Sequence, residues 1–204
     1  VVIIVVVAVL TFRDGGHPAV DGRRHAARLV GVERQHHGVA VQPCPLQALG
    51  LPVRRVVEEA AYAVSGALGW PADLADRRFF LWVHFFDPHV PYDPPDEFLK
   101  MYDPAPYNGQ VKNHRTHLML DEAKKNPKKY EFTARDKERI EALHDGEISY
   151  HDAYFARFLA KLDELGLDEN TIVVVTSDHG EEFQEHGSWG HGHSVYQELL
   201  HVPL

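Results

Sequence analysis

Cysteine is almost absent from this chain of 204 residues, and the only one is Cys44. A single cysteine cannot form an internal disulfide framework, so the fold depends on its apolar core. The longest apolar run, Val1–Leu10, is too short to cross a bilayer, which takes about twenty apolar residues. We expect no complete membrane span, and we interpret this run as a buried first strand, with the tail of a removed anchor or signal as the alternative. The net charge of −9 argues against a general nucleic-acid binder.

The first 78 residues contain no lysine and only three aromatic residues, whereas the remaining part holds eighteen of the twenty-one aromatic residues. Nine Arg and seven acidic residues give the first part a formal charge of +2, and the rest carries −11. Such a shift in residue usage predicts a boundary near residue 76.

The segment Thr171–Thr176 is rich in β-branched residues and predicts a buried parallel strand. It is followed by Ser177, Asp178, His179 and Gly180. Ligands of open α/β sheets bind beyond the carboxyl ends of the strands, and adjacent oxygen and nitrogen donors suit a divalent cation. These residues indicate half of a metal-dependent hydrolase site. The alternative is a turn that caps the strand, with Asp178 bonding backbone amides and Gly180 at positive φ.

Histidines gather after this strand, where five of the fifteen lie between His179 and His201. The loop that carries His186, His191 and His193 is rich in glycine and poor in apolar residues, so it cannot be a core segment. This pattern favours a site over a simple turn.

A second motif follows the apolar run Phe79–Phe86 and has the sequence Asp87-Pro-His89-Val-Pro. Prolines fix the backbone on both sides of His89, as a positioned catalytic group requires, although any ordered loop would show the same rigidity. Asp87 either orients His89 or caps the turn. His84 lies inside the run and is interpreted as a core or supporting histidine.

A long helix is predicted between the two motifs. Thr133 and Asp136 form a capping-box pattern, apolar residues recur at helical spacing up to Leu165, and Gly166 supplies a stop. The helix should connect two strands of one sheet, and Gly146 within it marks a kink or a tight packing contact. Residues 100–132 have few large aliphatic side chains, so we expect a solvated surface insertion, with a basic patch for an anionic substrate as the alternative.

The quoted motifs resemble the sulfatase family of the alkaline-phosphatase-like superfamily. Segments 177–187, 189–192 and 195–204 are similar to its late catalytic block, and segment 79–95 is similar to its middle strand and His-x-Pro loop. The resemblance covers about residues 77–204. It implies an α/β sandwich with a mostly parallel central sheet flanked by helices, incomplete at both ends. Residues 77–204 would then be a partial catalytic domain, and residues 1–76 a divergent segment or the product of a reading-frame error.

The resemblance also implies roles for single residues. Asp178 and His179 match the late metal ligands, and His89 matches the histidine that reaches the sulfuryl or phosphoryl group and helps the leaving oxygen depart. His191 lies near the position where relatives place a Lys or His against the bound anion. Asp87, His186 and His193 are candidates for support. Calcium is the family's usual metal, and the His179 nitrogen makes zinc or manganese the alternatives.

One family feature is missing. The family carries an early Asp pair and a Cys- or Ser-x-Pro-Ser/Ala-Arg motif whose Cys or Ser becomes a formylglycine nucleophile. Cys44 lacks the downstream Ser and Arg, so no nucleophile is assigned. We therefore expect a metal-dependent hydrolase of small-molecule or glycan sulfate esters, inactive in the form of this chain.

The rivals are a phosphodiester or phosphonate monoester hydrolase of the same superfamily and a non-catalytic metal-binding or structural remnant. A periplasmic, extracellular or membrane-anchored location and the oligomeric state stay open.

Overall fold

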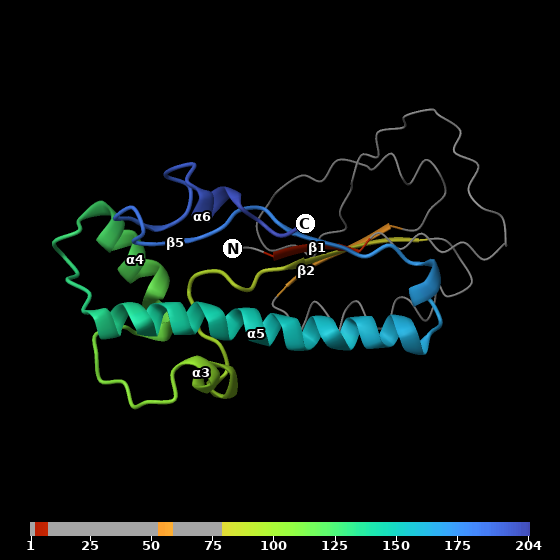
Figure 1. Ribbon diagram of the computed structural model, residues 1–204, viewed down its shortest axis with the longest axis horizontal. Coiled ribbons are helices and arrows are strands. Elements are labelled where there is room, and N and C mark those ends of the chain that lie inside the picture. Colours follow the sequence, from red (N-terminus) through yellow and green to blue (C-terminus); the bar gives the residue numbers. More distant parts are fainter. Residues whose placement is uncertain (1–2, 8–52, 59–78) are drawn as a thin grey trace.

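The computed structural model describes residues 3–7, 53–58 and 79–204 (Figure 1). Cys44 and the predicted boundary near residue 76 lie outside them. Four strands form the main sheet in the order β2-β3-β1-β4, and two short strands pair separately. Their bounds are β1 Ile3–Val7, β2 Val53–Glu58, β3 Phe80–Phe85, β4 Val174–Ser177, β5 Glu182–Phe183 and β6 Trp189–Gly190.

The first strand is confirmed and lies inside the sheet, between β3 and β4. It runs antiparallel to both neighbours, whereas β2 and β3 are parallel. Strands β2, β3 and β4 therefore share one direction, but β1 opposes them, which departs from the mostly parallel sheet that we expected. The β-branched residues of β1 favour an extended strand of either direction, so the sequence pattern cannot predict its direction.

The long helix α5, Ala134–Glu164, connects β3 and β4 and runs alongside the sheet (Figure 1). Alternate residues of β3 are buried, and the alternation places them on the same face of the sheet. They form one core with the second half of α5. This core comprises Phe79, Leu81, Val83, Phe85, Phe158, Leu162 and Leu167. The predicted strand–helix–strand connection is confirmed.

The predicted capping box at the start of α5 is present. The Thr133 side chain accepts a hydrogen bond from the Asp136 backbone N–H at 3.1 Å, and the Asp136 carboxylate accepts one from the Thr133 N–H at 3.0 Å. Within the helix, a Cβ added at Gly146 would lie 2.9 Å from Cγ of Pro94, so glycine permits a tight packing contact there. Pro94 leads into α3, Asp96–Tyr102, which packs against α5.

Strand β4 begins three residues later than predicted, at Val174. A short 3-10 turn, η2 Asp168–Asn170, comes first, and the Thr171 hydroxyl donates to the Leu167 carbonyl. The first three residues of β4 are only partly buried, and the strand pairs antiparallel with β1, so the prediction of a buried parallel strand is wrong for them. Among the described strands β4 pairs with β1 alone, and an edge strand is less covered than a central one.

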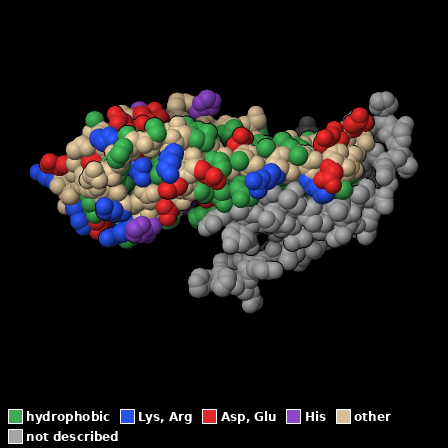
Figure 2. Space-filling view, turned by 90° about the horizontal axis from the view of Figure 1, so that it is seen from below, with side chains coloured by type: hydrophobic (Ala, Val, Ile, Leu, Met, Phe, Trp, Pro, Cys, Tyr) green, Lys and Arg blue, Asp and Glu red, His purple; other side chains and the backbone are tan. Residues whose placement is uncertain are grey.

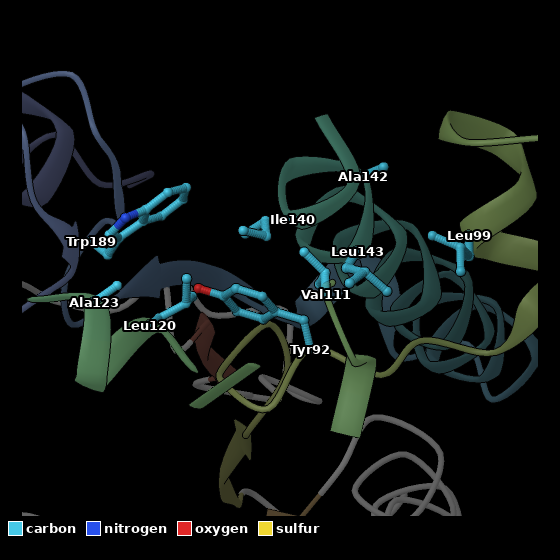
Figure 3. Packing of buried hydrophobic residues seen from close by; sticks show 9 residues of the cluster. All are labelled: Tyr92, Leu99, Val111, Leu120, Ala123, Ile140, Ala142, Leu143 and Trp189. Atoms are coloured by element: carbon cyan, nitrogen blue, oxygen red, sulfur yellow. The ribbon is translucent and has the colours of Figure 1, made fainter. Parts of the chain in front are cut away.

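We expected residues 100–132 to be a solvated surface insertion, but part of this segment is buried. They form η1, Asn113–Arg115, and α4, Thr116–Lys125, whose buried residues include Met119, Leu120 and Ala123. Of these, Leu120 and Ala123 pack in a second core, close to Trp189 of β6 (Figure 3). That core comprises Tyr92, Leu99, Val111, Leu120, Ala123, Ile140, Ala142, Leu143 and Trp189.

Two lysines of the basic run 124–129 form ion pairs with acidic side chains of α4. Lys125 contacts Asp121 at 2.5 Å, and Lys129 contacts Glu122 at 2.8 Å. Figure 2 likewise shows acidic and basic side chains interspersed over the described part of one face. This arrangement favours a solvated charged surface over a basic patch. Within the described ranges, no helix is both long and apolar enough to cross a membrane.

Candidate active site

The two motifs singled out in the sequence meet at one place. The imidazole of His179, just beyond β4, stacks on that of His191 with 3.8 Å between ring centroids and 26° between planes. The ring of His89, in the loop after β3, lies 5.3 Å from His191 and 6.5 Å from His179. We call His89, His179 and His191 the imidazole cluster. Two segments far apart in sequence, the loop after β3 and the region after β4, thus bring nitrogen donors to the end of the sheet.

Asp178 and His179 have the geometry of two ligands of one ion. Oδ1 of Asp178 lies 3.5 Å from Nε2 of His179, a separation that two donors at about 2.0–2.3 Å from a shared cation can have. Nδ1 of His179 lies 2.7 Å from the carbonyl oxygen of Gly180. A proton on Nδ1 satisfies this contact and leaves the Nε2 lone pair for a metal, as is typical of ligating histidines.

The pair therefore fits two positions of a metal site. The described residues contain no group of three or more His, Cys, Asp or Glu side chains arranged to hold a metal. Further donors to an ion bound here would have to come from water, substrate or residues outside the described ranges.

Glu181 orients the third imidazole. Its buried carboxylate lies 3.0 Å from Nδ1 of His191 and accepts a hydrogen bond from the Tyr92 hydroxyl at 2.7 Å. Burial alone would raise the pKa of Glu181, but nearby positive charge and hydrogen bonds, the largest from His191 and another from Tyr92, together lower it to about 2. The carboxylate therefore stays charged, attracts a proton to Nδ1 of His191 and turns Nε2 away.

His89 is held in a different way. Its Nδ1 lies 2.8 Å from the Val90 carbonyl, so a proton on Nδ1 leaves Nε2 free to accept. Burial lowers the pKa of His89, and the neighbouring His191 lowers it further. The neutral ring is therefore favoured, with a lone pair on Nε2.

The loop around His89 is fixed by Glu147 of α5. One carboxylate oxygen accepts the His89 backbone N–H at 3.1 Å, and the other accepts the Asp93 N–H at 2.8 Å. Burial raises the pKa of Glu147 to about 8, with Asp87 and Asp93 adding negative charge nearby, while the two N–H donors act in the opposite direction. The capping or orienting role predicted for Asp87 stays a prediction.

The glycine-rich loop is organised around a second buried acid, Glu182. Its carboxylate lies 2.7 Å from Nε2 of His193 and accepts the backbone N–H groups of His186 and Ser188 at 3.1 and 2.8 Å. The His186 ring contacts Tyr196, with 3.6 Å between centroids. Neither His186 nor His193 has a ring contact with the imidazole cluster among those observed, a placement in keeping with a supporting role.

Gly180 has a steric role instead of the positive φ considered from the sequence. Its N–H donates to the Leu199 carbonyl at 2.8 Å, and an added Cβ would lie 1.8 Å from the Glu198 carbonyl oxygen. Glycine lets α6, Gln197–Leu200, pack directly behind His179. Positive φ occurs later in the loop, at Gly187, Gly190 and Gly192.

Sequence reasoning missed Glu147, Glu181 and Tyr92. A signal existed for Glu147, which lies on the apolar stripe of α5 at four-residue spacing between Leu143 and His151. An acid on a buried helix face requires polar partners, and the neighbouring loop supplies them.

Comparison with known proteins agrees with this architecture. The Sulfatase family model matches residues 61–204. Human Iduronate 2-sulfatase is 25% identical over 208 residues, which cover 92% of this chain and 36% of that protein. The Arylsulfatase of Clostridium perfringens (strain 13 / Type A) is 32% identical over 160 residues, which cover 72% of this chain and 32% of that enzyme. Endo-4-O-sulfatase of Bacteroides thetaiotaomicron is 27% identical over 132 residues, or 63% of this chain and 23% of the relative.

The match to the Sulfatase family implies an α/β fold of alkaline-phosphatase-like type. The described residues show mixed helices and strands in keeping with that class, with a small and incomplete sheet. Within that class, the chain belongs to the sulfatase family. The match reaches residue 61, beyond the motifs recognised in residues 77–204. The chain spans about a third of the length of the first curated relatives that it matches.

Proposed function

We propose that residues 79–204 form part of the active site of a metal-dependent hydrolase that acts on sulfate esters of small molecules or glycans. The observation that carries this proposal is the convergence of His89, His179 and His191 beside Asp178. Sulfatases act on sulfate esters and the family is metal-dependent, so this convergence has a clear chemical use.

Asp178 and His179 would hold the divalent cation through Oδ1 and Nε2. When bound, the cation would supply positive charge that polarises the ester's sulfuryl oxygens. Calcium is our first choice because it is the family's usual metal, and the nitrogen donor of His179 keeps zinc and manganese as alternatives.

His89 and His191 would treat the anion differently. His191, with a charged Glu181 on Nδ1, presents the opposite ring edge as a hydrogen-bond donor to a sulfuryl oxygen when Nε2 is protonated. His89 presents an unprotonated Nε2, which would take up a proton from water and donate it to the departing alcohol oxygen. No described residue is assigned as nucleophile.

Metal binding tests the ligand assignment. Replacing Asp178 with Asn should weaken binding of Ca²⁺ or Mn²⁺ by at least about tenfold, because even residues that only support a ligand cost 10- to 100-fold in affinity. Calorimetric titration of the purified chain measures this. The matched control is Asp168→Asn, an exposed acid at the other end of the crossover, which should bind as the unmodified chain does. Equal affinities for both variants would contradict the assignment.

Turnover separates the rival functions. Aryl sulfate and aryl phosphate esters are assayed with the unmodified chain in the presence of calcium, manganese or zinc. Because no nucleophile is assigned, we expect negligible turnover but measurable binding of aryl sulfate in the presence of metal. Preferential binding of aryl phosphate would favour the phosphodiester or phosphonate hydrolase. Binding of neither ester nor metal would favour the structural remnant, and robust sulfate release would overturn the expected inactivity.

A further inference from the structure

Glu147, a buried acid of the long helix α5, accepts hydrogen bonds from both ends of the loop that carries His89. Glu147 accepts the backbone N–H of His89 with one oxygen at 3.1 Å and that of Asp93 with the other at 2.8 Å. These partners are 58 and 54 residues away in sequence. A single side chain on a rigid helix therefore fixes two points of the loop, on either side of the Val90-Pro91-Tyr92 turn.

Local contacts of this loop do not fix its position relative to the sheet. The His89 ring bonds only to the carbonyl of its own neighbour, Val90, among the hydrogen bonds observed for its side chain. That contact orients the ring relative to the loop, but it does not fix the position of the loop relative to the rest of the protein. The Tyr92 hydroxyl bonds to Glu181 beside His191, but it lies three residues beyond His89. The contact that anchors the backbone of His89 itself is the one to Glu147 of α5.

The surroundings keep Glu147 in place. It is 4% exposed, and one turn away on each side His144 and His151 are buried. The Tyr92 backbone N–H also bonds outside the loop, to the Thr116 hydroxyl of α4 at 2.7 Å. Glu147 and Thr116 thus hold adjacent parts of the loop from two helices, but only Glu147 contacts the backbone of His89 itself.

We propose that Glu147 is a positioning residue for His89: its carboxylate sets the distance and orientation of the His89 imidazole to His179 and His191 through two backbone hydrogen bonds. The expected effect on ester binding rests on the function proposed above for His89. The positioning itself is a structural property and is measured separately.

The variant Glu147→Gln tests this role. Glutamine keeps the size of the side chain but replaces one acceptor oxygen with an NH₂ group, which faces a backbone N–H and cannot accept it. One of the two anchors is therefore lost. The matched control is Glu141→Gln, the same change at an exposed position of the same helix.

The readout is the histidine side-chain NMR spectrum of ¹⁵N-labelled protein above pH 8, where Glu147 is ionised and both of its oxygens can accept. In the unmodified chain, His89 should show one ordered tautomer with the proton on Nδ1, and Glu147→Gln should shift and broaden this signal. The signals of His151 are the internal reference. This ring lies four residues from Glu147 on α5 and is buried against Phe85 at 4.2 Å, so a general loosening of the core would move it as well.

Aryl sulfate binding in the presence of metal should weaken by about tenfold in Glu147→Gln, the lower end of what supporting residues contribute, and should not change in Glu141→Gln. If no variant binds aryl sulfate but the His89 signal still depends on Glu147, the proposed function fails and the positioning role stands. If His89 is unchanged in a folded Glu147→Gln protein, or if His89 and His151 change together, the positioning role is wrong.

A measurement on the unmodified chain covers the case in which the variant does not fold. The amide protons of His89 and Asp93 should exchange slowly with solvent, and each should show a scalar coupling across its hydrogen bond to the Glu147 carboxylate carbon. Fast exchange of both amides, with no such coupling, would overturn the proposal.

Discussion

Replacing Glu181 with Leu should lower the free energy of unfolding by about 3 kcal/mol. The carboxylate is buried and accepts the hydroxyl of Tyr92, whose side chain is itself fully buried. Leucine removes the acceptor, leaves the hydroxyl without that partner inside the core and removes the charge beside His191. An unsatisfied buried donor costs about 1–3 kcal/mol, and breaking a buried charged pair adds to it.

Denaturant unfolding of three variants and of the unmodified chain measures this effect. Glu181→Gln keeps an acceptor for Tyr92 and should lose less stability than Glu181→Leu. The control Glu185→Gln, at an exposed position of the same loop, should stay within about 0.5 kcal/mol of the unmodified chain. If Glu181→Leu costs no more than Glu185→Gln, the two hydrogen bonds do not hold the loop in solution.

The second large effect is a loss of stability in acid that depends on His151. Burial between Phe85 and Phe155 lowers the pKa of His151 to about 4, from an ordinary value of 6.5. The unfolded chain binds this proton more readily than the folded chain. The stabilisation is therefore complete above pH 6.5 and is lost as the pH falls toward 4. The loss between these values is roughly 3 kcal/mol for this group.

The variant His151→Phe isolates this contribution, because phenylalanine keeps the ring contacts but binds no proton. Any cost of the larger ring is the same at all pH values, so only the slope of stability against pH is compared. Glu147 acts oppositely in part of this range: its pKa is raised to about 8, so its contribution is lost as the pH rises from 4.5 toward 8. That contribution is present in both proteins and cancels in the comparison.

Chemical denaturation at several pH values between 4 and 7 gives the slopes. His151→Phe should lose less stability than the unmodified chain as the pH falls. The control His117→Phe changes an exposed ring on α4 and should keep the original slope. Parallel curves for the unmodified chain and His151→Phe would show that His151 is hydrated in solution.

Local sequence patterns predicted those helices and strands whose structure depends mainly on their own residues. The alternation in β3, the capping box at Thr133 and the apolar stripe of α5 were all visible as residue spacing. The pattern failed where tertiary context decides. The direction of β1 depends on its partners, and α4 joins the core through only a few apolar residues such as Met119 and Leu120.

The site divides in the same way. Asp178, His179 and His89 were selected from the sequence because they follow strands, where ligands collect, and because the motifs resemble the sulfatase family. The structure brings these residues close together, and their roles stay predictions. Glu147 was missed because its two partners lie 58 and 54 residues away, and Glu181 because its partner Tyr92 lies 89 residues away. A single sequence shows an acid near a glycine or on a helix stripe, but the partner that makes it necessary appears only after folding.

The convergence of the two motifs on one cation is tested most directly by paramagnetic relaxation. Mn²⁺ added at low stoichiometry to ¹⁵N-histidine-labelled chain should broaden the ring signals of His179, His191 and His89 before those of any other described histidine. Asp178→Asn should abolish this selective broadening. Broadening centred on exposed histidines such as His114 or His117, with the three cluster rings unaffected, would contradict the account.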